Sequence, residues 1–347
     1  MIKRKKTKQV SVGNIQIGGY APISVQSMCT ADTRDIDATV RQIKELEEVN
    51  CELVRVAVLD EVAAGNLGEI KKQINIPLIA DIHFNHKLAL IAIDQGIDAL
   101  RINPGNIGKI DNVKEVVMAA KMNNVPIRIG VNGGSLEKEF ASFPLEKAMV
   151  KSALRQVKLL EKLKFEDIVI SLKSSDVMTT IKAYEKISKK VKYPLHLGVT
   201  EAGTLKCGLI KSTAGLAPLL LKGIGDTIRV SLTDNPVEEV IAGHEILRAL
   251  GIRKEGVNFI SCPTCGRCQL NIMPIANEIQ RLTASSQKNV TIAVMGCAVN
   301  GPGEAKHADL GIACGKKQGI IFKKGQVIKT VPEADIIQEF MKEFELL

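Results

Sequence analysis

Residues 77–105, PLIADIHFNHKLALIAIDQGIDALRINPG, contain the pattern that decides the fold. A short apolar run, PLIADIHF (77–84), leads into a helix-length segment and then into a second short run, ALRINPG (99–105). Both runs carry polar side chains two residues apart, Asp81 and His83 in the first and Arg101 and Asn103 in the second. This strand–helix–strand order is typical of a parallel sheet whose strands are joined by crossover helices.

The same unit recurs along residues 23–250. Six further runs match it: ISVQSM (23–28), LVRVAVL (53–59), PIRIGVN (126–132), DIVISLK (167–173), PLHLGVTEAG (194–203) and DTIRVSL (226–232). Helical patterns separate them, among them residues 36–49, 113–123, 145–163 and 236–250. Eight such units predict an α/β fold, a TIM (β/α)8 barrel. An open doubly wound sheet is the alternative, but the GxGxxG that usually follows its first strand is missing.

Segments on either side of the barrel have other patterns. Residues 8–20, KQVSVGNIQIGGY, predict a hairpin that turns at Gly13-Asn14, so residues 1–22 form an N-terminal segment that plugs the barrel from below. After GIRKEG (251–256), strand-like runs VNFIS, NVTIAVMG, DLGIAC, GIIFKK and QVIKTV accompany two helical patterns. Residues 253–347 therefore predict a small α/β domain.

The composition limits the classes of protein and partner. Hydrophobic residues make up 45% and charged residues 24%, as in ordinary globular proteins. No run approaches the ~20 apolar residues of a membrane span, and the basic start MIKRKKTKQV lacks the apolar stretch of a signal peptide. We therefore predict a cytoplasmic protein with no membrane partner. Disulfides are rare there, so its eight cysteines indicate metal binding or burial.

A net charge of +9 admits nucleic acid, an acidic substrate or an acidic protein as partner. Aromatic residues, on which single-stranded nucleic acids stack, are only 3% of the chain. We therefore expect no nucleic-acid partner. A zinc-stabilised RNA-binding protein would account for the charge and the cysteines, but not for the polar residues at the strand ends.

Cations stand at the carboxyl ends of five predicted strands: Arg55, Arg101, Arg128, Lys173 and Arg229, here called the barrel cations. Strand alternation puts further polar residues on their faces or on neighbouring strands: Asp81, His83, Asn103, Asn132 and Ser231. Catalytic residues of such barrels lie at this end of the strands.

Five unpaired charges cannot sit in an apolar core, because burying even one costs several kcal/mol. The strand-end acids expected near them are only Asp81 and Glu201. Each cation could instead pair outside the barrel with a helix carboxylate, but this is a poor explanation for all five. The pattern favours a substrate with several phosphate charges, held by forked arginine contacts.

Two cysteine loops follow strands of the second domain. One is Cys262-Pro-Thr-Cys265 and the other contains Cys297. Zinc would need four protein ligands and would only stabilise the fold. An iron–sulfur cluster would take Cys262, Cys265 and Cys297, with the fourth ligand open between Cys268, Glu304 and Cys314. We expect Cys29, Cys51 and Cys207 to be small buried hydrophobes.

At this point the sequence resembles a known family, the bacterial 4-hydroxy-3-methylbut-2-en-1-yl diphosphate synthases of the non-mevalonate isoprenoid pathway. The matching segments are VQSM, ADIHFN, RINPGN, RIGVN, TEAG, SCPTCGR and GCAVNGPGEA, in order between residues 25 and 305. The resemblance implies an oxidoreductase that opens and dehydrates 2-C-methyl-D-erythritol 2,4-cyclodiphosphate. It also implies a [4Fe-4S] cluster reduced by ferredoxin or flavodoxin, and a homodimer. A pterin- or folate-type barrel transferase, the other alternative, leaves the cysteine domain unexplained.

The resemblance also implies roles for single residues. The cluster ligands carry over to Cys262, Cys265, Cys297 and the exchangeable Glu304. The diphosphate cradle consists of the barrel cations and Ser231, with Asp81, His83, Asn103 and Asn132 beside them. Glu201, in TEAG, faces the reacting carbons, and Glu201, Glu304 and His83 are the expected catalytic residues. Cys268 departs from the family pattern and competes with Glu304 as the fourth ligand.

Overall fold

The computed structural model describes residues 2–103, 107, 109–140, 142–297 and 305–347, and it separates two compact units, Met1–Arg253 and Lys254–Leu347. The first unit is a barrel of parallel strands. These are β3 (Ser24–Met28), β4 (Leu53–Val58), β5 (Leu78–Ile82), β6 (Ala99–Ile102), β7 (Ile127–Asn132), β8 (Ile168–Lys173), β9 (His196–Leu197) and β10 (Thr227–Ile228). Their order is β8-β7-β6-β5-β4-β3-β10-β9, and a parallel bridge from Ile170 to Leu195 joins the two ends. The predicted TIM barrel is confirmed.

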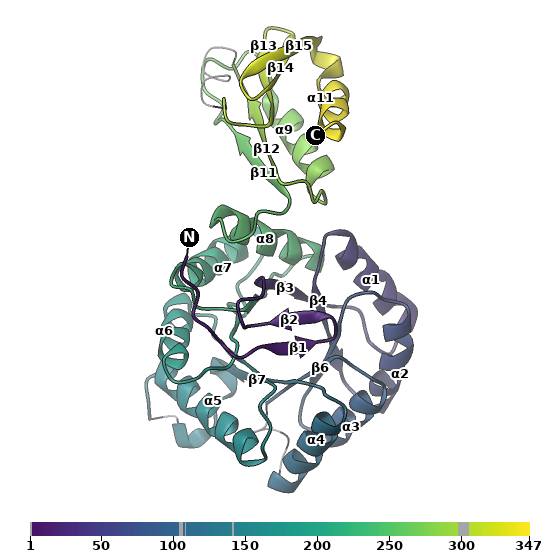
Figure 1. Ribbon diagram of the computed structural model, residues 1–347, viewed down its shortest axis with the longest axis vertical. Helices are drawn as coiled ribbons and strands as arrows, with labels where there is room; N and C mark the ends of the chain where they lie inside the picture. Colours follow the sequence, from purple (N-terminus) through teal and green to yellow (C-terminus); the bar gives the residue numbers. More distant parts are fainter. Residues whose placement is uncertain (1, 104–106, 108, 141, 298–304) are drawn as a thin grey trace. The chain divides into compact units, whose positions relative to one another are not determined.

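Eight helices surround the strands (Figure 1). They are α1 (Ile36–Glu48), α2 (Glu61–Lys72), α3 (His86–Asp94), α4 (Ile110–Met122), α5 (Leu145–Lys162), α6 (Val177–Ser188), α7 (Leu205–Leu221) and α8 (Pro236–Ala249). Two 3-10 turns, η1 (Gly133–Ser135) and η2 (Lys138–Phe140), follow β7. Five helices begin where an Asp or Asn side chain accepts a backbone N–H of the first turn: Asp35, Asp60, Asn85, Asp176 and Asn235. These caps satisfy donors that the helix itself leaves free.

Two predicted strands are much shorter in the structure. The runs at 194–203 and 226–232 form ladders of only two residues each, β9 and β10. The carboxyl half of the first run is a loop in which Glu201 and Gly203 have left-handed φ values of 53° and 112°. The two predicted strands therefore included residues that belong to the loops at the mouth of the barrel.

The N-terminal hairpin closes the other end of the barrel. Strands β1 (Val10–Val12) and β2 (Ile15–Ile17) pair antiparallel around Gly13, which has a left-handed φ of 55°. Val12 and Ile17 pack in one apolar cluster with Leu53, Ile79 and Ala99, which stand at or near the amino ends of β4, β5 and β6. Figure 1 shows the hairpin lying across the strands. The polar side chains of the barrel interior lie above this apolar layer.

The second unit is a five-stranded sheet with helices on one face. Its order is β11 (Val257–Ser261), β12 (Val290–Met295), β13 (Leu310–Gly315), β14 (Gln318–Lys323) and β15 (Gln326–Pro332). The first three strands are parallel and the last two antiparallel. Helices α9 (Ile272–Thr283) and α11 (Ile336–Glu345) cover one face through residues such as Ile279 and Phe340, and the turn η3 (Glu333–Asp335) precedes α11. In the described part of the chain, no helix is both long and apolar enough to cross a membrane.

Candidate active site and cysteine loops

Charged side chains fill the interior of the barrel above the apolar layer that the hairpin forms with β4, β5 and β6. In the strand register Asp81 lies opposite Arg101, and Arg101 lies opposite Arg128. These three side chains and Lys173 are buried, with 5–6% of their surface exposed. The structure thus brings four residues singled out in the sequence into one interior. The expected carboxyl-end position was wrong for Arg128 and Arg55, which stand in the amino-terminal halves of β7 and β4.

Asp81 joins two of the barrel cations. Its Oδ1 lies 3.0 Å from Arg101 Nη1, and its Oδ2 lies 3.7 Å from Arg55 Nε. Burial alone would raise the pKa of Asp81, but the charges of Arg55 and Arg101 and a hydrogen bond with His83 hold it well below its ordinary value. His83 Nε2 lies 3.0 Å from Arg101 Nη1. The same nitrogen lies 3.5 Å from Asp81 Oδ1, so one imidazole atom faces both the guanidinium and the carboxylate.

A second carboxylate, Glu239, comes from the first turn of α8 and was missed in the sequence analysis. It lies 3.3 Å from Arg229 Nε and accepts hydrogen bonds from Ser27 Oγ (3.0 Å) and the backbone N–H of Leu232 (2.9 Å). Glu239 is a helix residue and adds to the two strand-end acids expected from the sequence, Asp81 and Glu201; Glu201 is exposed. A signal was available, because Glu239 lies on the apolar face of its predicted helix, between Pro236 and Val240.

Two barrel cations lack a carboxylate partner among the described residues, Arg128 and Lys173. Arg128 donates through Nη1 to Gln26 Oε1 at 2.5 Å. Burial, reinforced by the neighbouring cations, lowers the pKa of both groups well below their ordinary values, and it lowers the pKa of Arg55 to about 10. The interior thus holds more positive than negative charge, and a bound anion would relieve that imbalance.

Two glycines leave room for these cations. A Cβ atom at position 130 would lie 2.4 Å from Arg101 Nε. One at position 198 would lie 3.0 Å from Lys173 Nζ and 2.8 Å from the Arg229 carbonyl oxygen. Neither glycine needs an unusual φ, so close approach explains both.

The other predicted site residues surround this centre. Asn103 is buried and accepts a hydrogen bond from Gln156 Nε2 of α5 at 2.8 Å. Gln156 was also missed, although a polar residue on the buried face of an amphipathic helix is a recognisable signal. Asn132 lies opposite Lys173 in the β7–β8 register, and Ser231 is half-buried beyond β10. The catalytic role of Glu201 stays a prediction.

In the second unit, the cysteine loops follow neighbouring parallel strands. Cys262 comes directly after β11 and Cys297 two residues after β12, so both lie at the same edge of the sheet. Cys262 Sγ accepts the backbone N–H of Gly296 at 3.0 Å. A Cβ atom at position 296 would lie 2.2 Å from Cys268 Sγ and 3.3 Å from Cys262 Sγ, so both thiols lie over this glycine.

The donor set at this edge consists of thiols. Burial raises the pKa of Cys262, and the neighbouring thiols of Cys268, Cys297 and Cys265 add to the increase. Within the described ranges, no three His, Cys, Asp or Glu side chains are arranged to ligate one metal ion. Glu304 lies outside the described residues.

Of the remaining cysteines, Cys29, Cys51 and Cys207 were predicted to be small buried hydrophobes, and Cys314 was one candidate for the fourth ligand. Cys29 and Cys51 are buried, and burial raises the pKa of each to about 12. Cys207 is exposed on α7, so its predicted burial was wrong. Cys314 is buried in β13, where burial and the nearby thiols of Cys262 and Cys268 raise its pKa to about 11.

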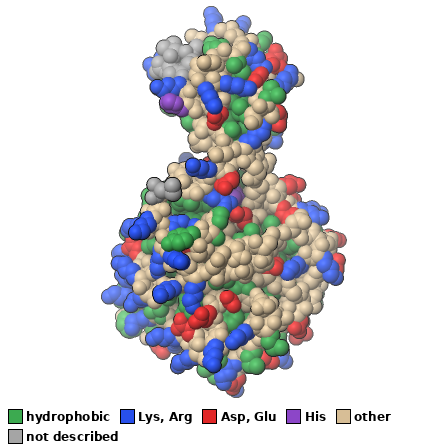
Figure 2. All heavy atoms as spheres, in the orientation of Figure 1, with side chains coloured by type: hydrophobic (Ala, Val, Ile, Leu, Met, Phe, Trp, Pro, Cys, Tyr) green, Lys and Arg blue, Asp and Glu red, His purple; other side chains and the backbone are tan. Residues whose placement is uncertain are grey.

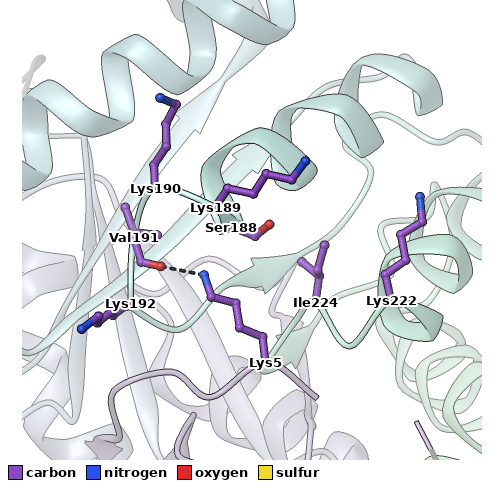
Figure 3. Close-up of a pocket in the computed structure, with 8 residues that line it drawn as sticks. All are labelled: Lys5, Ser188, Lys189, Lys190, Val191, Lys192, Lys222 and Ile224. Atoms are coloured by element: carbon purple, nitrogen blue, oxygen red, sulfur yellow. Dashed lines mark hydrogen bonds between the residues drawn. The ribbon is translucent and has the colours of Figure 1, made fainter. Parts of the chain in front are cut away.

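An open pocket of about 490 Å³ lies away from the barrel mouth. It is lined by five lysines with Ser188, Val191 and Ile224: Lys5, Lys189, Lys190, Lys192 and Lys222. Figure 3 shows Lys5 bonded to the Val191 carbonyl, at 2.7 Å, while Lys190 and Lys222 point outward. The lining segments precede β9 and β10, at the amino end of the strands, where conserved residues of such barrels serve stability. We assign no catalysis to this pocket.

Comparison with known proteins gives matches over nearly the whole chain. A 4-hydroxy-3-methylbut-2-en-1-yl diphosphate synthase (flavodoxin) of Caldanaerobacter subterraneus subsp. tengcongensis is 58% identical, and the alignment covers 99% of this chain and 98% of the relative. The protein of that name from Clostridium perfringens is 56% identical, with 100% of both chains covered.

Two solved structures resemble part of this chain. A truncated 3-deoxy-D-arabino-heptulosonate 7-phosphate synthase from Thermotoga maritima has a TM-score of 0.51 at 14% identity, covering 72% of this chain and 95% of that one. Dihydropteroate synthase from Xanthomonas albilineans has a TM-score of 0.50 at 14% identity, covering 70% and 97%. At this identity the likeness concerns the fold only.

Both units of the chain match one family. Residues 7–244 match the GcpE TIM-barrel domain, and residues 258–346 match the GcpE protein C-terminal domain. The two matches together span the barrel with its cations and the sheet with its cysteine loops. This chain therefore belongs to the GcpE family.

Proposed function

We propose that the chain catalyses the reductive ring opening and dehydration of 2-C-methyl-D-erythritol 2,4-cyclodiphosphate to 4-hydroxy-3-methylbut-2-enyl diphosphate, with flavodoxin as electron donor. The observation that carries the proposal is the pair of buried cations, Arg128 and Lys173, for which the described part of the chain supplies no carboxylate partner. A diphosphate supplies the missing charge, and the names of the full-length relatives specify which diphosphate.

Besides binding the substrate, the barrel cations would stabilise the negative charge that develops during the reaction. Opening of the ring frees a phosphate oxygen, which gains negative charge as the carbon–oxygen bond breaks. Preorganised cations in a water-poor interior stabilise such charge without having to reorient. Asp81 and Glu239 hold Arg101 and Arg229 in place, whereas Arg128 and Lys173 offer their charge to the substrate.

The cysteine loops fit an iron–sulfur cluster in donor type. Cysteine thiolates are the usual protein ligands of such clusters. Cys262, Cys265 and Cys297 would hold it, with Glu304 as the exchangeable fourth ligand. When bound, the cluster supplies the two electrons of the reaction. Glu201 is the acid that we place at the reacting carbons, and His83, bonded to Arg101, positions that guanidinium.

The chain is proposed to act as a homodimer. Large apolar side chains are exposed after the carboxyl ends of β4, β5 and β8, namely Leu59, Phe84 and Met178. Such residues around a barrel mouth are typical of a surface that a partner covers. Sedimentation equilibrium of the holoprotein should give twice the chain mass, and a monomer at micromolar concentration would exclude this assembly.

The test of the function is anaerobic turnover. Purified holoprotein should be brown, with broad absorption near ~400 nm. With reduced flavodoxin and the cyclodiphosphate it should form the open-chain allylic diphosphate. A colourless, zinc-containing preparation that leaves the cyclodiphosphate unchanged would overturn the proposal.

A further inference from the structure

A second, much smaller cavity lies inside the barrel, beneath the barrel cations. Its volume is about 20 Å³, which is enough for one water-sized species and too small for a polyatomic oxyanion. Its floor is formed by Val12 and Ile17 of the hairpin, and its walls include Ile79 and Val169. The polar side chains that line it are Gln26, Arg128 and Thr227.

These three side chains are buried, with 1%, 5% and 1% of their surface exposed, respectively. Four of their polar atoms have no hydrogen-bond partner: Gln26 Nε2, Arg128 Nε, Arg128 Nη2 and Thr227 Oγ1. Gln26 Oε1 is already occupied by Arg128 Nη1, at 2.5 Å. Buried polar groups are nearly always satisfied, so four unsatisfied atoms on one cavity call for a ligand there.

The chemistry of these atoms distinguishes an anion from water. Three of the four can only donate, namely Gln26 Nε2, Arg128 Nε and Arg128 Nη2. A water molecule can accept two hydrogen bonds, fewer than these three donors need, whereas a halide can accept from all of them. Arg128 also brings a positive charge with no carboxylate within ion-pair distance among the described residues.

We propose that this cavity binds one monatomic anion, chloride under ordinary conditions, through Arg128, Gln26 and Thr227. The anion lies on the hairpin side of Arg128, where it offsets part of the positive charge of the guanidinium and holds that group in place. This is a structural site beneath the substrate cradle, and it stands whether or not the proposed reaction is correct.

Bromide tests the site directly. Crystals of the full-length holoprotein grown in sodium bromide should show an anomalous peak within hydrogen-bonding distance of Arg128 Nη2 and Thr227 Oγ1. In solution, thermal unfolding at constant ionic strength should give a higher Tm in sodium chloride or bromide than in sodium gluconate, whose anion does not fit. Water in the cavity would give neither the anomalous peak nor a difference between the salts, and that result would overturn the proposal.

A pair of variants separates the site from general salt effects. Thr227→Val removes one hydroxyl at nearly constant volume and should weaken halide binding about tenfold, because one hydrogen bond to a charged partner is lost. Ser212→Ala is the matched control: Ser212 Oγ on α7 is also buried and unpartnered but does not line the cavity. Its halide-dependent Tm difference should equal that of the wild type. An equal loss in both variants, or in neither, would contradict the assignment.

Discussion

At the scale of single residues, the barrel interior is organised by which cations have partners. Arg101 and Arg229 are held by Asp81 and Glu239, whereas Lys173 is buried beside other cations. Gly198 adds a geometric condition, because a side chain there would meet both Lys173 Nζ and the Arg229 carbonyl. Lys173 and Arg229 therefore determine both the charge of the barrel interior and the space available beside Gly198.

Lys173→Ala should leave the cluster intact and weaken substrate binding. Loss of one charge-assisted contact to phosphate should cost ~1.5–3 kcal/mol, which raises KM about tenfold to a hundredfold. Steady-state kinetics and the absorption spectrum of the holoprotein measure the two effects. If KM and kcat both stay at the wild-type values, Lys173 does not belong to the cradle.

The depressed pKa of Lys173 predicts a proton linkage. Between that pKa and the ordinary value of 10.5 the folded protein binds fewer protons at this site than the unfolded chain, so stability rises with pH across the window. A bound diphosphate favours the charged ammonium, so binding of inorganic pyrophosphate should take up a proton in this window. Calorimetry in buffers of different ionisation enthalpy detects the uptake. It should vanish in Lys173→Met, and identical uptake in both proteins would contradict the linkage.

The reactivity of the cluster depends on whether Cys268 or Glu304 is its fourth ligand. The Sγ of Cys268 lies with that of Cys262 over Gly296, and thiolate suits iron better than carboxylate. A cluster with four thiolates, however, offers no exchangeable position to a substrate oxygen. We expect Cys268→Ser to keep the [4Fe-4S] spectrum and most activity, and Glu304→Ala to keep much of the cluster and lose turnover. If Cys268→Ser is colourless while Glu304→Ala is active, Cys268 is the ligand.

At the scale of elements, the hairpin β1–β2 acts as part of the barrel core. Ile17 is 3% exposed and packs against residues of the barrel strands. Ile17→Ala should lower the free energy of unfolding by about 2–5 kcal/mol, because it removes buried apolar surface and leaves a cavity. Gln16→Ala on the exposed face of the same strand is the control and should change stability by less than about 0.5 kcal/mol. Chemical denaturation measures both, and equal small effects would mean that the hairpin is peripheral.

At the scale of the whole molecule, the net charge of +9 matters for the electron donor. Figure 2 shows Lys and Arg side chains spread over the visible face of the barrel together with acidic ones. Complementary charge speeds association with an acidic carrier such as flavodoxin, and salt screens this effect. Turnover driven by reduced flavodoxin should therefore fall as salt rises, more steeply than turnover driven by a small chemical reductant. Equal salt sensitivity for the two donors would count against steering.

The sequence by itself determined the barrel, the order of its eight units and the cysteine-bearing second unit. These features follow from local patterns, apolar periodicity and cysteine spacing, which act over a few residues. Alternation along a strand also put Asp81, Arg101 and Arg128 on the interior face, because successive side chains of a strand point to opposite faces. Asp81 and Arg101 stand near the carboxyl ends of β5 and β6, whereas Arg128 stands near the amino end of β7.

Only the tertiary structure decided which charges meet. Glu239 reaches Arg229 and Ser27 from a helix, Gln156 reaches Asn103 from another, and no spacing along the chain encodes either contact. The lengths of β9 and β10 were likewise set by the loops at the mouth rather than by strand propensity. Whether a buried cation has a partner depends on side chains brought together by the closed barrel. The sequence could therefore single out five barrel cations, but not that Arg128 and Lys173 are the two without a carboxylate partner among the described residues.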